Sequence, residues 1–395
     1  MKLHVYGLFG GTNFGDELFA KYIVDRIHEA GGFSVPYLFT EDEAWSRRNV
    51  ADFVPVVGFP VPNAGLRNWW RGLRSLRNSG GLLFGGGGLF NEVFLRADVV
   101  SKAIVLAACK LYGVPYIMHG IEIGYVGSRL NRWLTGWALR NAERVICRNR
   151  GSRLRAREVY GMRVKLGADI NQAWLLDLMA TDPREASGRP RFVINLQHSL
   201  DLDDDYARRL IEQQRAAGYS AVFLTGNEAE GAAIRDRFGD LVDELILAPT
   251  VASTARALRS GDAFLTERFH YTMAALHSNR PTYVIVSSTK VRQLLERLTR
   301  ASVPLTTLRG GGTDRTVLYT AGSPEQAALT AEWGRTARQQ LTSVLRQFLS
   351  RPDADRRSFR PQYIPLLVAF YTVFVWYYLL DRFFPLRRHL DLNKT

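Results

Sequence analysis

The chain has 395 residues, of which 46% are hydrophobic and 23% charged, and this balance excludes a wholly disordered protein. Two cysteines are too few for a disulfide scaffold or a cysteine-rich zinc site. The formal net charge of +14 comes almost entirely from arginine, which favours contacts with phosphates, carboxylates, nucleic acids or anionic lipids. A GC-rich genome would also favour arginine over lysine.

The first half of the chain alternates short apolar runs with longer segments of helical periodicity. A glycine-rich turn at 10–15 separates the first strand from the first helix. This alternation predicts a parallel, doubly wound sheet. We expect strands at 3–8, 35–39, 80–84, 114–119 and 144–148, and helices at 16–28, 97–112 and 130–141.

A polar, turn-rich stretch at 181–190 predicts a linker, after which the alternation starts again. We expect strands at 191–196, 220–224, 245–248, 263–265 and 282–286, and helices at 204–217, 228–238, 251–260, 268–278 and 289–300. The fold class is therefore α/β, with two Rossmann-like domains at 1–180 and 191–325. Two such domains face a cleft at the carboxyl ends of both sheets, where ligands bind. A helical, basic connector follows at 326–360.

The tail from 361 to 395 differs in kind from both domains. Residues 363–380 contain no charged side chain, and a spanning helix needs ~20 apolar residues, with a lower limit of ~17. Trp376 and its two tyrosine neighbours suit an interfacial belt. We expect this segment to contact a membrane, by spanning it or by lying in its interface. A terminal helix packed across the two domains is the alternative.

A second segment, 66–77, has the pattern of a basic amphipathic helix. Its apolar residues recur at helical spacing and arginines occupy the other positions; the apolar residues are Leu66, Trp69, Trp70, Leu73 and Leu76. This pattern is typical of helices at a membrane interface. The alternative is a surface helix whose apolar stripe belongs to the core.

Two glycine-rich turns follow predicted strands. In the first, Asn13, Gly15 and Asp16 lead into a helix, whose N-terminus attracts anions, although an acid there also complements the helix dipole. The second is the run 85–88, which leaves room for a close ligand or forms a tight strand–helix crossover. Neither spacing matches a dinucleotide-binding fingerprint or a Walker loop.

The segment 267–270 is the sharpest candidate site. It follows an apolar strand and opens a helix, so Arg268 and His270 are expected at the carboxyl edge of the second sheet. A cation and an imidazole at a helix N-terminus suit phosphate binding and proton transfer. Arg148, at the end of a first-domain strand, would face them across the cleft, and His119 would line it. The alternative for His270 is a core histidine.

Taken in order, these segments resemble the polysaccharide pyruvyl transferase family. The matching stretches are 6–17, 84–90, 145–152, 167–169, 267–270 and 288–291, which cover about residues 3–300. Phe269 replaces the leucine of the family's Arg-Leu-His signature, and Asn149 replaces the acid that follows Arg148. The tail from 351 onward has no counterpart in the family.

The resemblance implies that phosphoenolpyruvate is the donor. Pyruvate would be installed as a cyclic ketal on a hydroxyl pair of a cell-surface glycan or its lipid-linked precursor. The resemblance also implies the two-domain architecture of GT-B glycosyltransferases, with the acceptor on the first domain and the donor on the second. Arg268 and His270 correspond to donor-binding residues, joined by Arg148 and Lys290. The acceptor and loop candidates are Asn13, Gly15, Gly86, Gly87, Gly88 and His119.

Two arginines suit a donor with a phosphate and a carboxylate, since each anion accepts a bidentate pair. We assign Arg268 and Arg148 to these anions, His270 as general acid or phosphate ligand, and Asp16 as general base for the sugar hydroxyl. We expect no metal and no cofactor, because no cluster has metal-ligand spacing. An enzyme that meets a lipid-linked acceptor would lie at the cytoplasmic face of the membrane.

Two other functions remain open from the sequence. A nucleotide-sugar-dependent glycosyltransferase shares the fold and the cleft, and differs in the donor. A non-catalytic, membrane-tethered family member is the other, although the candidate site residues are retained. We expect no nucleic-acid partner, because the basic residues form no aromatic-interleaved patch beyond 66–77.

Overall fold

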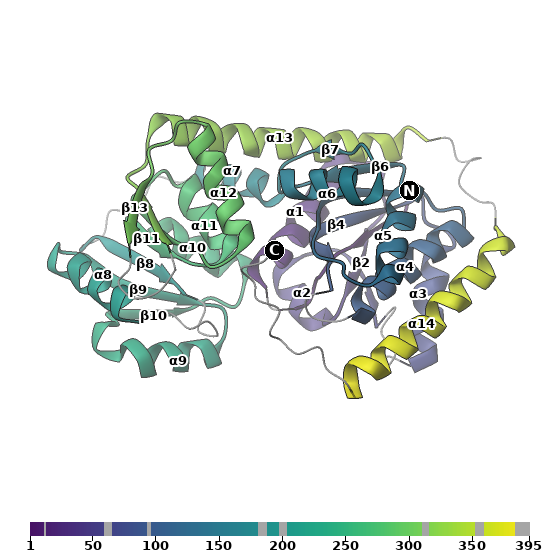
Figure 1. Cartoon of the computed structure of the whole chain (residues 1–395), viewed down its shortest axis with the longest axis horizontal. Helices are drawn as coiled ribbons and strands as arrows, with labels where there is room; N and C mark the ends of the chain where they lie inside the picture. Colours follow the sequence, from purple (N-terminus) through teal and green to yellow (C-terminus); the bar gives the residue numbers. More distant parts are fainter. Residues whose placement is uncertain are drawn as a thin grey trace. The chain divides into compact units, whose positions relative to one another are not determined.

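The computed structural model describes residues 1–11, 13–58, 65–92, 96–180, 188–196, 204–309, 316–351 and 359–383. The chain forms two compact units (Figure 1). Unit 1 comprises Met1–Gly11, Asp16–Ile170 and Thr336–Thr395, and unit 2 comprises Thr12–Gly15 and Asn171–Arg335. The contacts thus divide the chain ahead of the expected linker, of which residues 181–187 lie outside the described residues.

Unit 1 contains a parallel sheet with strand order β3-β2-β1-β4-β5-β6-β7. Its strands are β1 (Leu3–Tyr6), β2 (Tyr37–Thr40), β3 (Val54–Val57), β4 (Gly81–Phe90), β5 (Tyr116–Ile123), β6 (Arg144–Cys147) and β7 (Lys165–Leu166). The helices between them are α1 (Phe14–Ala30), α2 (Glu43–Asn49), α3 (Gly65–Leu76), α4 (Arg96–Leu111), α5 (Arg129–Asn141) and α6 (Arg150–Tyr160). The order reverses between β1 and β4, so the segments that follow these strands lie where doubly wound sheets bind ligands.

Unit 2 contains a second sheet, ordered β10-β9-β8-β11-β12-β14-β13. Its strands are β8 (Arg191–Asn195), β9 (Ser220–Thr225), β10 (Glu244–Leu247), β11 (Ala263–Thr266), β12 (Thr282–Ile285), β13 (Thr306–Arg309) and β14 (Thr316–Thr320). Its helices are α7 (Asn171–Ala180), α8 (Asp204–Ala216), α9 (Glu228–Phe238), α10 (Val251–Ser260), α11 (Phe269–His277), α12 (Thr289–Arg300) and the first part of α13 (Pro324–Leu349), with a short 3-10 helix η2 (Gly239–Leu241).

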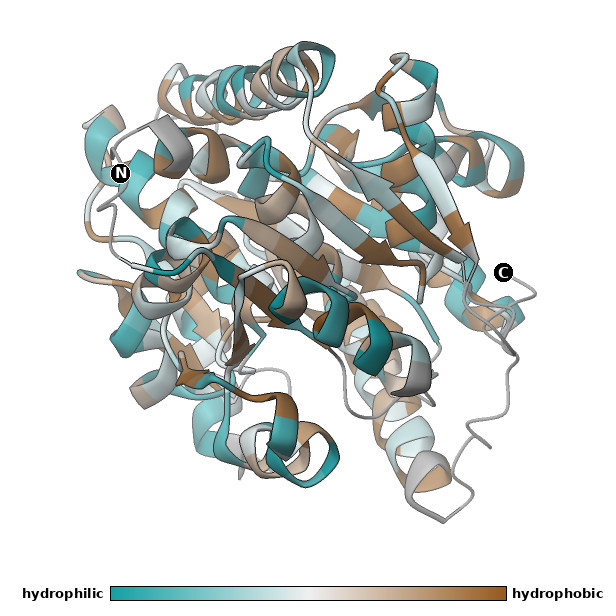
Figure 2. Ribbon diagram, turned by 90° about the vertical axis from the view of Figure 1, so that its left-hand side faces the viewer, coloured by the Kyte–Doolittle hydropathy of each residue, from teal (hydrophilic) through white to brown (hydrophobic). Residues whose placement is uncertain are grey.

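The predicted α/β class and the two doubly wound sheets are confirmed. Figure 2 shows hydrophobic residues along the strands, and helices around them that carry both hydrophobic and hydrophilic residues. This pattern is expected for sheets covered on both faces. The outer strands β3 and β7 of the first sheet were not predicted. The antiparallel pair β13 and β14, added to β12 at the edge of the second sheet, was not predicted either. Strands of four and five residues are too short for a clear period of two to show in the sequence.

The glycine run 85–88 corrects the expected turn after Phe84. Strand β4 continues through the run to Phe90 and pairs with β5, with a shift of register between Gly87 and Phe90. Gly86 and Gly87 have φ values of +84° and +88°, which residues with a Cβ rarely adopt. The run stays in the sheet as an irregular stretch because β5 pairs with Gly85 and Gly87.

The predicted apolar tail is a helix, α14 (Ile364–Phe383), which follows a short 3-10 turn, η4 (Pro361–Tyr363). It packs on α4 within unit 1, where Phe370 and Phe374 are buried (Figure 1). Helix α4 is buried on nearly every side because the sheet covers one face and α14 covers another. One face of the tail helix therefore belongs to the core of unit 1.

The opposite face of α14 is exposed and apolar. Val368 is 59% exposed, Trp376 61% and Leu379 43%. Among the described residues, Pro361–Leu380 is the helix that by length and composition could cross a membrane, with a mean hydropathy of 1.7 and 11% of its apolar window buried. Unit 1 thus carries an apolar helix with one packed and one exposed side.

The expectation that 66–77 lies at a membrane interface is corrected by the packing of α3 in unit 1. Trp69 and Leu76 are buried in the core of unit 1, and the Trp69 ring meets Tyr371 of α14 at 4.6 Å between centroids. The helix uses its apolar face for packing, as amphipathic surface helices do. Trp70 is the exception, since it is 63% exposed.

Candidate active site

The first part of the candidate site is the start of α1, after the glycine turn that follows β1. Asn13 caps this helix, because its Oδ1 accepts a hydrogen bond from the N–H of Gly15 at 3.1 Å. Asp16 and Glu17 follow in the first turn. The N–H of Gly10 donates to Glu17 Oε1 at 2.5 Å, so the carboxylate of Glu17 holds the turn against the helix.

The glycines of β4 lie beside this helix start within unit 1. A Cβ atom at Gly86 would lie 2.7 Å from the ring of Phe19, so Gly86 is required for close packing. A Cβ atom at Gly87 would lie 3.2 Å from Asp16 Oδ1. The structure therefore brings the predicted residues Gly87 and Asp16 together, and Gly87 and Gly88 are partly exposed there.

Glu17 is a polar group that the sequence analysis did not select. Its side chain is almost fully buried, and burial raises the pKa of Glu17 to about 7, with smaller contributions from Asp16 and Asp42 and opposition from the Gly10 N–H. Its Oε2 atom has no hydrogen-bond partner among the described residues. An acid next to a glycine turn was the available signal, but its burial was not visible in the sequence.

The Glu17→Gln variant tests this carboxyl through stability. The pKa of Glu17 is about 7 in the folded protein and 4.5 in the unfolded chain, so folding favours the protonated carboxyl. The free energy of unfolding therefore has its full contribution from this proton below pH 4.5 and loses it as the pH rises through 7. Glutamine keeps the acceptor for Gly10 without charge. We expect Glu17→Gln to raise the free energy of unfolding by about 2 to 3 kcal/mol at pH 8 and not at pH 4.5.

Denaturant titrations of Glu17→Gln between pH 4.5 and 8 measure this difference. The control is Glu158→Gln, because Glu158 forms an exposed ion pair with Arg157. This substitution makes the same chemical change at a carboxyl that is not buried. A stability difference between Glu17→Gln and the parent that is the same at every pH would contradict the buried, proton-holding carboxyl.

A second group of candidate residues lies in unit 2, where β11 ends and α11 begins. Arg268 stands at the N-cap position of α11 and forms an ion pair with Glu230 of α9. The Arg268 side chain is 28% exposed, whereas Glu230 is held inside by a 2.7 Å hydrogen bond from Thr225 Oγ1. Arg268 is thus fixed at one end and accessible at the carboxyl edge of the sheet.

His270 lies in the first turn of α11 and is half-buried, not sealed in the interior. A Cβ atom at Gly15 would lie 1.8 Å from His270 Nδ1, so the absence of a side chain at Gly15 makes room for the imidazole. The carbonyl of Gly15 accepts a 2.8 Å hydrogen bond from Asn171 Nδ2, and Phe14 packs on Tyr271 at 5.1 Å between centroids. The structure therefore joins two motifs that are 255 residues apart in the sequence.

Lys290 lies near the same edge of the second sheet. It is partly exposed in the first turn of α12, which Ser288 caps. The preceding segment is tied to the segment after β11, because Ser287 Oγ donates to the carbonyl of Glu267 at 3.2 Å. The sheet pairing of β11 with β12 places both helix starts on neighbouring strands.

Arg148 and His119 are placed differently from the expectation. The guanidinium of Arg148 is buried and paired with Glu122 and Asp169, the latter at 3.1 Å. These two carboxylates raise its pKa against the opposing effect of burial, so binding a donor anion would require a pair to open. His119 is fully buried in the middle of β5, which continues to Ile123. Its side chain therefore does not line an open surface where a sugar could bind.

Burial lowers the pKa of His119 to about 3, so its ring is neutral and serves packing.

Among the residues that the structure describes, no group of three or more His, Cys, Asp or Glu side chains is placed to hold a metal ion.

A model of the polysaccharide pyruvyl transferase family matches residues 13–289, more than two thirds of the chain. The chain belongs to the polysaccharide pyruvyl transferase family. The match starts at Asn13, includes Gly15, Arg268 and His270, and ends next to Lys290. No curated protein matches the chain in sequence. The chain is thus an enzyme of a family whose name describes pyruvyl transfer to polysaccharides.

Solved structures share the fold of this chain at low identity. The UDP-GlcNAc 2-epimerase of Neisseria meningitidis is 10% identical with a TM-score of 0.51, covering 96% of this chain and 100% of that chain. A Listeria monocytogenes protein described as a UDP-N-acetylglucosamine 2-epimerase has 10% identity, a TM-score of 0.51 and coverage of 98% and 97%. A Rickettsia africae glycosyltransferase has 8% identity, a TM-score of 0.51 and coverage of 89% and 99%. These likenesses show the GT-B-like fold alone.

Proposed function

We propose that the protein transfers pyruvate from phosphoenolpyruvate to a hydroxyl pair of a glycan and forms a cyclic ketal. The observation that carries this proposal is the fit of the His270 imidazole against Gly15, beside Arg268 at the start of α11. The family match to residues 13–289 supports the pyruvyl group and the polysaccharide acceptor. The donor and the residue roles are our inference from the chemistry of these side chains.

The donor carries two anions on a small frame, so its binding site needs cations and N–H donors. Arg268 presents part of its guanidinium to solvent beside the N-terminus of α11, where unpaired backbone N–H groups also attract anions. Lys290 supplies a second cation from the start of the neighbouring helix α12. We therefore assign Arg268 and Lys290 to the phosphate and carboxylate, and Arg148 to a structural pair with Glu122 and Asp169.

The proposed reaction begins with protonation of the methylene carbon of the enol, which leaves an oxocarbenium-like centre at the adjacent carbon. One sugar hydroxyl adds to this centre and gives up its proton. The phosphate then leaves with the electron pair of its C–O bond. The second hydroxyl adds to the same carbon and closes the ketal, and its proton passes to the released phosphate. The balance is one donor and one diol in, one ketal and one inorganic phosphate out.

Two groups have proton-transfer chemistry suited to these steps. We assign His270 as general acid or ligand of the leaving phosphate, and Asp16 as general base for the sugar hydroxyl. Asp16 directly follows Gly15 in the first turn of α1, and it lies beside Gly87. The pKa of about 7 at Glu17 provides a neighbouring carboxyl that holds or releases a proton near neutral pH.

The direct test incubates the full chain with phosphoenolpyruvate and a panel of free and lipid-linked glycans. We expect phosphate release that depends on the acceptor, together with the mass increment of a pyruvyl ketal on the same acceptor. Release of a nucleotide from a sugar nucleotide, without consumption of phosphoenolpyruvate, would contradict the proposal and favour an ordinary glycosyltransferase.

We propose further that the exposed face of α14 contacts the cytoplasmic face of a membrane, where lipid-linked glycans are available. The other face packs on unit 1 from Phe370 to Tyr377, whose hydroxyl lies 3.1 Å from Ser128 Oγ. A helix held to a domain along its length meets a bilayer from the side, as in-plane interfacial helices do. Trp376 and Trp70, both more than half exposed, suit the interfacial region.

The variant Val368→Asp/Trp376→Asp tests this contact while leaving the packed face intact. Each apolar side chain contributes roughly 1.5–3 kcal/mol when buried, so we expect membrane partition to fall ~100-fold with little change in the melting temperature. Cosedimentation with vesicles measures the partition. The control Val35→Asp/Val159→Asp changes two exposed valines elsewhere in the first half of the chain. Equal loss in both double variants would contradict the assignment to α14.

A further inference from the structure

Helix α14 lies over α4 with α3 on one side and α5 on the other, all within unit 1 (Figure 1). Toward α3, the Tyr371 ring contacts Trp69 at 4.6 Å between centroids. Toward α5, the Phe370 ring contacts Trp137 at 5.4 Å and Trp133 at 6.0 Å. Consecutive residues of a helix point about 100° apart, so Tyr371 and Phe370 face different neighbours. The three helices α3, α14 and α5 therefore share one surface of unit 1.

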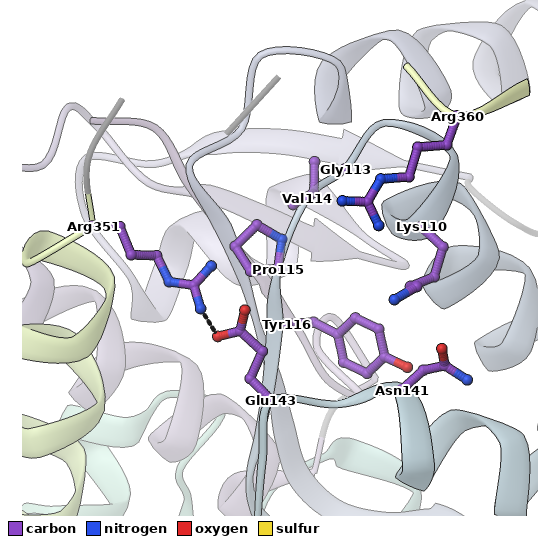
Figure 3. A pocket seen from close by; sticks show the side chains of 9 residues that line it. All are labelled: Lys110, Gly113, Val114, Pro115, Tyr116, Asn141, Glu143, Arg351 and Arg360. Atoms are coloured by element: carbon purple, nitrogen blue, oxygen red, sulfur yellow. Dashed lines mark ion pairs between the residues drawn. The ribbon is translucent and has the colours of Figure 1, made fainter. Parts of the chain in front are cut away.

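Both halves of α14 are anchored to unit 1. Before the helix begins, the backbone N–H of Arg360 donates to the carbonyl of Leu111 at 2.7 Å. Figure 3 shows the side chain of Arg360 beside Lys110, in the last turn of α4. Further along, the hydroxyl of Tyr377 lies 3.1 Å from Oγ of Ser128, the N-cap of α5. The exposed side chains of α14 are therefore held in a fixed position beside α3 and α5.

Exposed tryptophans and arginines border α14 on both sides. On α3, Trp70 is 63% exposed and shares a helix face with the arginines three residues before it and four residues after it. On α5, Trp133 is 48% exposed and shares a face with the arginines four residues before it and seven residues after it. These four arginines are all exposed: Arg67, Arg74, Arg129 and Arg140. The apolar face of α14 is thus flanked by aromatic and basic side chains.

No acidic residue on α3 or α5 balances these arginines, because neither helix contains Asp or Glu. Within the part of the chain that the structure describes, none of the four arginines forms an ion pair. In sequence, the stretches 59–64 and 93–95 carry no charge, and 352–358 has two acidic and two basic residues. Residues 384–395, which follow α14, add three basic residues and one acidic residue. The surface around α14 therefore has an excess of positive charge.

Helix stability does not account for these arginines. The first turn of a helix favours acids and disfavours cations, because the helix dipole is positive there. Arg67 and Arg129 nevertheless lie in the first turns of α3 and α5, which contain no acid. An anionic partner outside the chain would compensate these charges. A nucleic acid would do so but would leave the apolar face of α14 in water, whereas an anionic bilayer also buries that face.

We propose that α3, α14 and α5 form one surface that selects anionic lipid bilayers. The inference rests on the membrane contact of α14 proposed above, and it names the lipid charge that this contact prefers. The exposed face of α14 enters the interface, and Trp70 and Trp133 lie at the level of the headgroups. The flanking arginines bind lipid phosphates, for which the planar guanidinium is suited. Helix α3 contributes only its exposed face, since its apolar stripe remains in the core.

The test measures cosedimentation of the full chain with phosphatidylcholine vesicles, with and without phosphatidylglycerol. The variants are Arg67→Gln/Arg74→Gln and Arg129→Gln/Arg140→Gln. Each arginine near an anionic surface strengthens binding about 5-fold, so we expect each variant to bind the phosphatidylglycerol vesicles ~30-fold more weakly. Binding to the neutral vesicles is expected to match the parent, and added salt should weaken only the binding to anionic vesicles.

The matched control is Arg209→Gln/Arg235→Gln, which removes two exposed arginines from unit 2. We expect this control to bind both kinds of vesicle as the parent does. Melting temperatures show which variants are folded, and the two arginine pairs on different helices give independent measurements. Equal loss in the control and in the two variants would overturn the proposal, because the effect would then follow net charge and not this surface.

The vesicle series also separates this proposal from those on which it rests. Equal binding of the parent to neutral and anionic vesicles overturns the selectivity and leaves the contact of α14 standing. No binding of the parent to either vesicle overturns the contact and the selectivity together. Binding to double-stranded DNA that the arginine variants weaken, and that Val368→Asp/Trp376→Asp does not, assigns the surface to nucleic acid and overturns the proposal. None of these measurements uses turnover, so a failure of pyruvyl transfer is detected separately.

Discussion

Replacing His270 by alanine is expected to lower turnover of phosphoenolpyruvate by ~10²-fold or more, typical of the loss of an acid–base or charge-stabilising group. Replacing Arg268 by alanine is expected to have an effect of the same order, because the donor anions lose a guanidinium. Turnover is measured as acceptor-dependent phosphate release. The exposed histidine of α1 supplies the control His28→Ala, which should leave turnover unchanged.

Arg268→Ala also leaves the carboxylate of Glu230 without its cation, so it will destabilise unit 2. The double variant Arg268→Ala/Glu230→Gln removes both charges and separates this effect from catalysis. We expect the double variant to regain stability but not turnover, and Arg268→Lys to keep part of the turnover through its charge. Near-normal turnover in folded His270→Ala and Arg268→Ala variants would remove both residues from the proposed site.

Replacing Gly15 by alanine is expected to reduce turnover nearly as far as His270→Ala does, although residue 15 has no side chain to offer chemistry. The new Cβ would lie 1.8 Å from His270 Nδ1, so the imidazole must move. Moving a side chain at its flexible end is tolerated by the fold, and alanine in the first turn of α1 carries no penalty in helix propensity. We therefore expect a melting temperature within a few degrees of the parent.

The double variant Gly15→Ala/His270→Ala makes this prediction specific. If Gly15 acts by leaving room for the imidazole, Gly15→Ala will have little further effect once His270 is alanine. The matched control is Gly11→Ala, because a Cβ there would meet only Glu41, at 3.9 Å. Additive losses in the double variant would mean that Gly15 matters for another reason, such as the hydrogen bond of its carbonyl with Asn171.

The architecture was predictable because it rests on local patterns. Short apolar runs followed by helical periodicity identified the parallel strands of the second sheet and five of the seven in the first, and glycine or polar breaks separated them. The outer strands β3 and β7 were missed. The edge pair of β13 and β14 was missed, since strands of four and five residues show no clear alternation and β14 is held in the sheet by β12, about 35 residues earlier. The extension of β4 through four glycines was missed because its pairing with β5, which begins about 30 residues later, holds it in the sheet.

The candidate site was predictable in part. Arg268 and His270 followed from a strand end and a helix start, which are local features. The pairing of Arg148 with Glu122 and Asp169, and the burial of His119, required the packing of β5 and β6 against their neighbours. Glu17 was not selected, because its pKa of about 7 is a property of its buried surroundings and not of its sequence position.

The sequence alone determined the α/β class and the central strands and helices of both sheets, where the cation and imidazole begin a helix, and that the tail is apolar. These features depend on residues near one another in the chain. The tertiary structure alone decided that the Gly15 backbone makes room for the His270 ring, that Arg148 is engaged by two acids, and that one side of α14 is covered. Each of these depends on which surfaces meet after folding, and burial and pairing energies act only through those contacts.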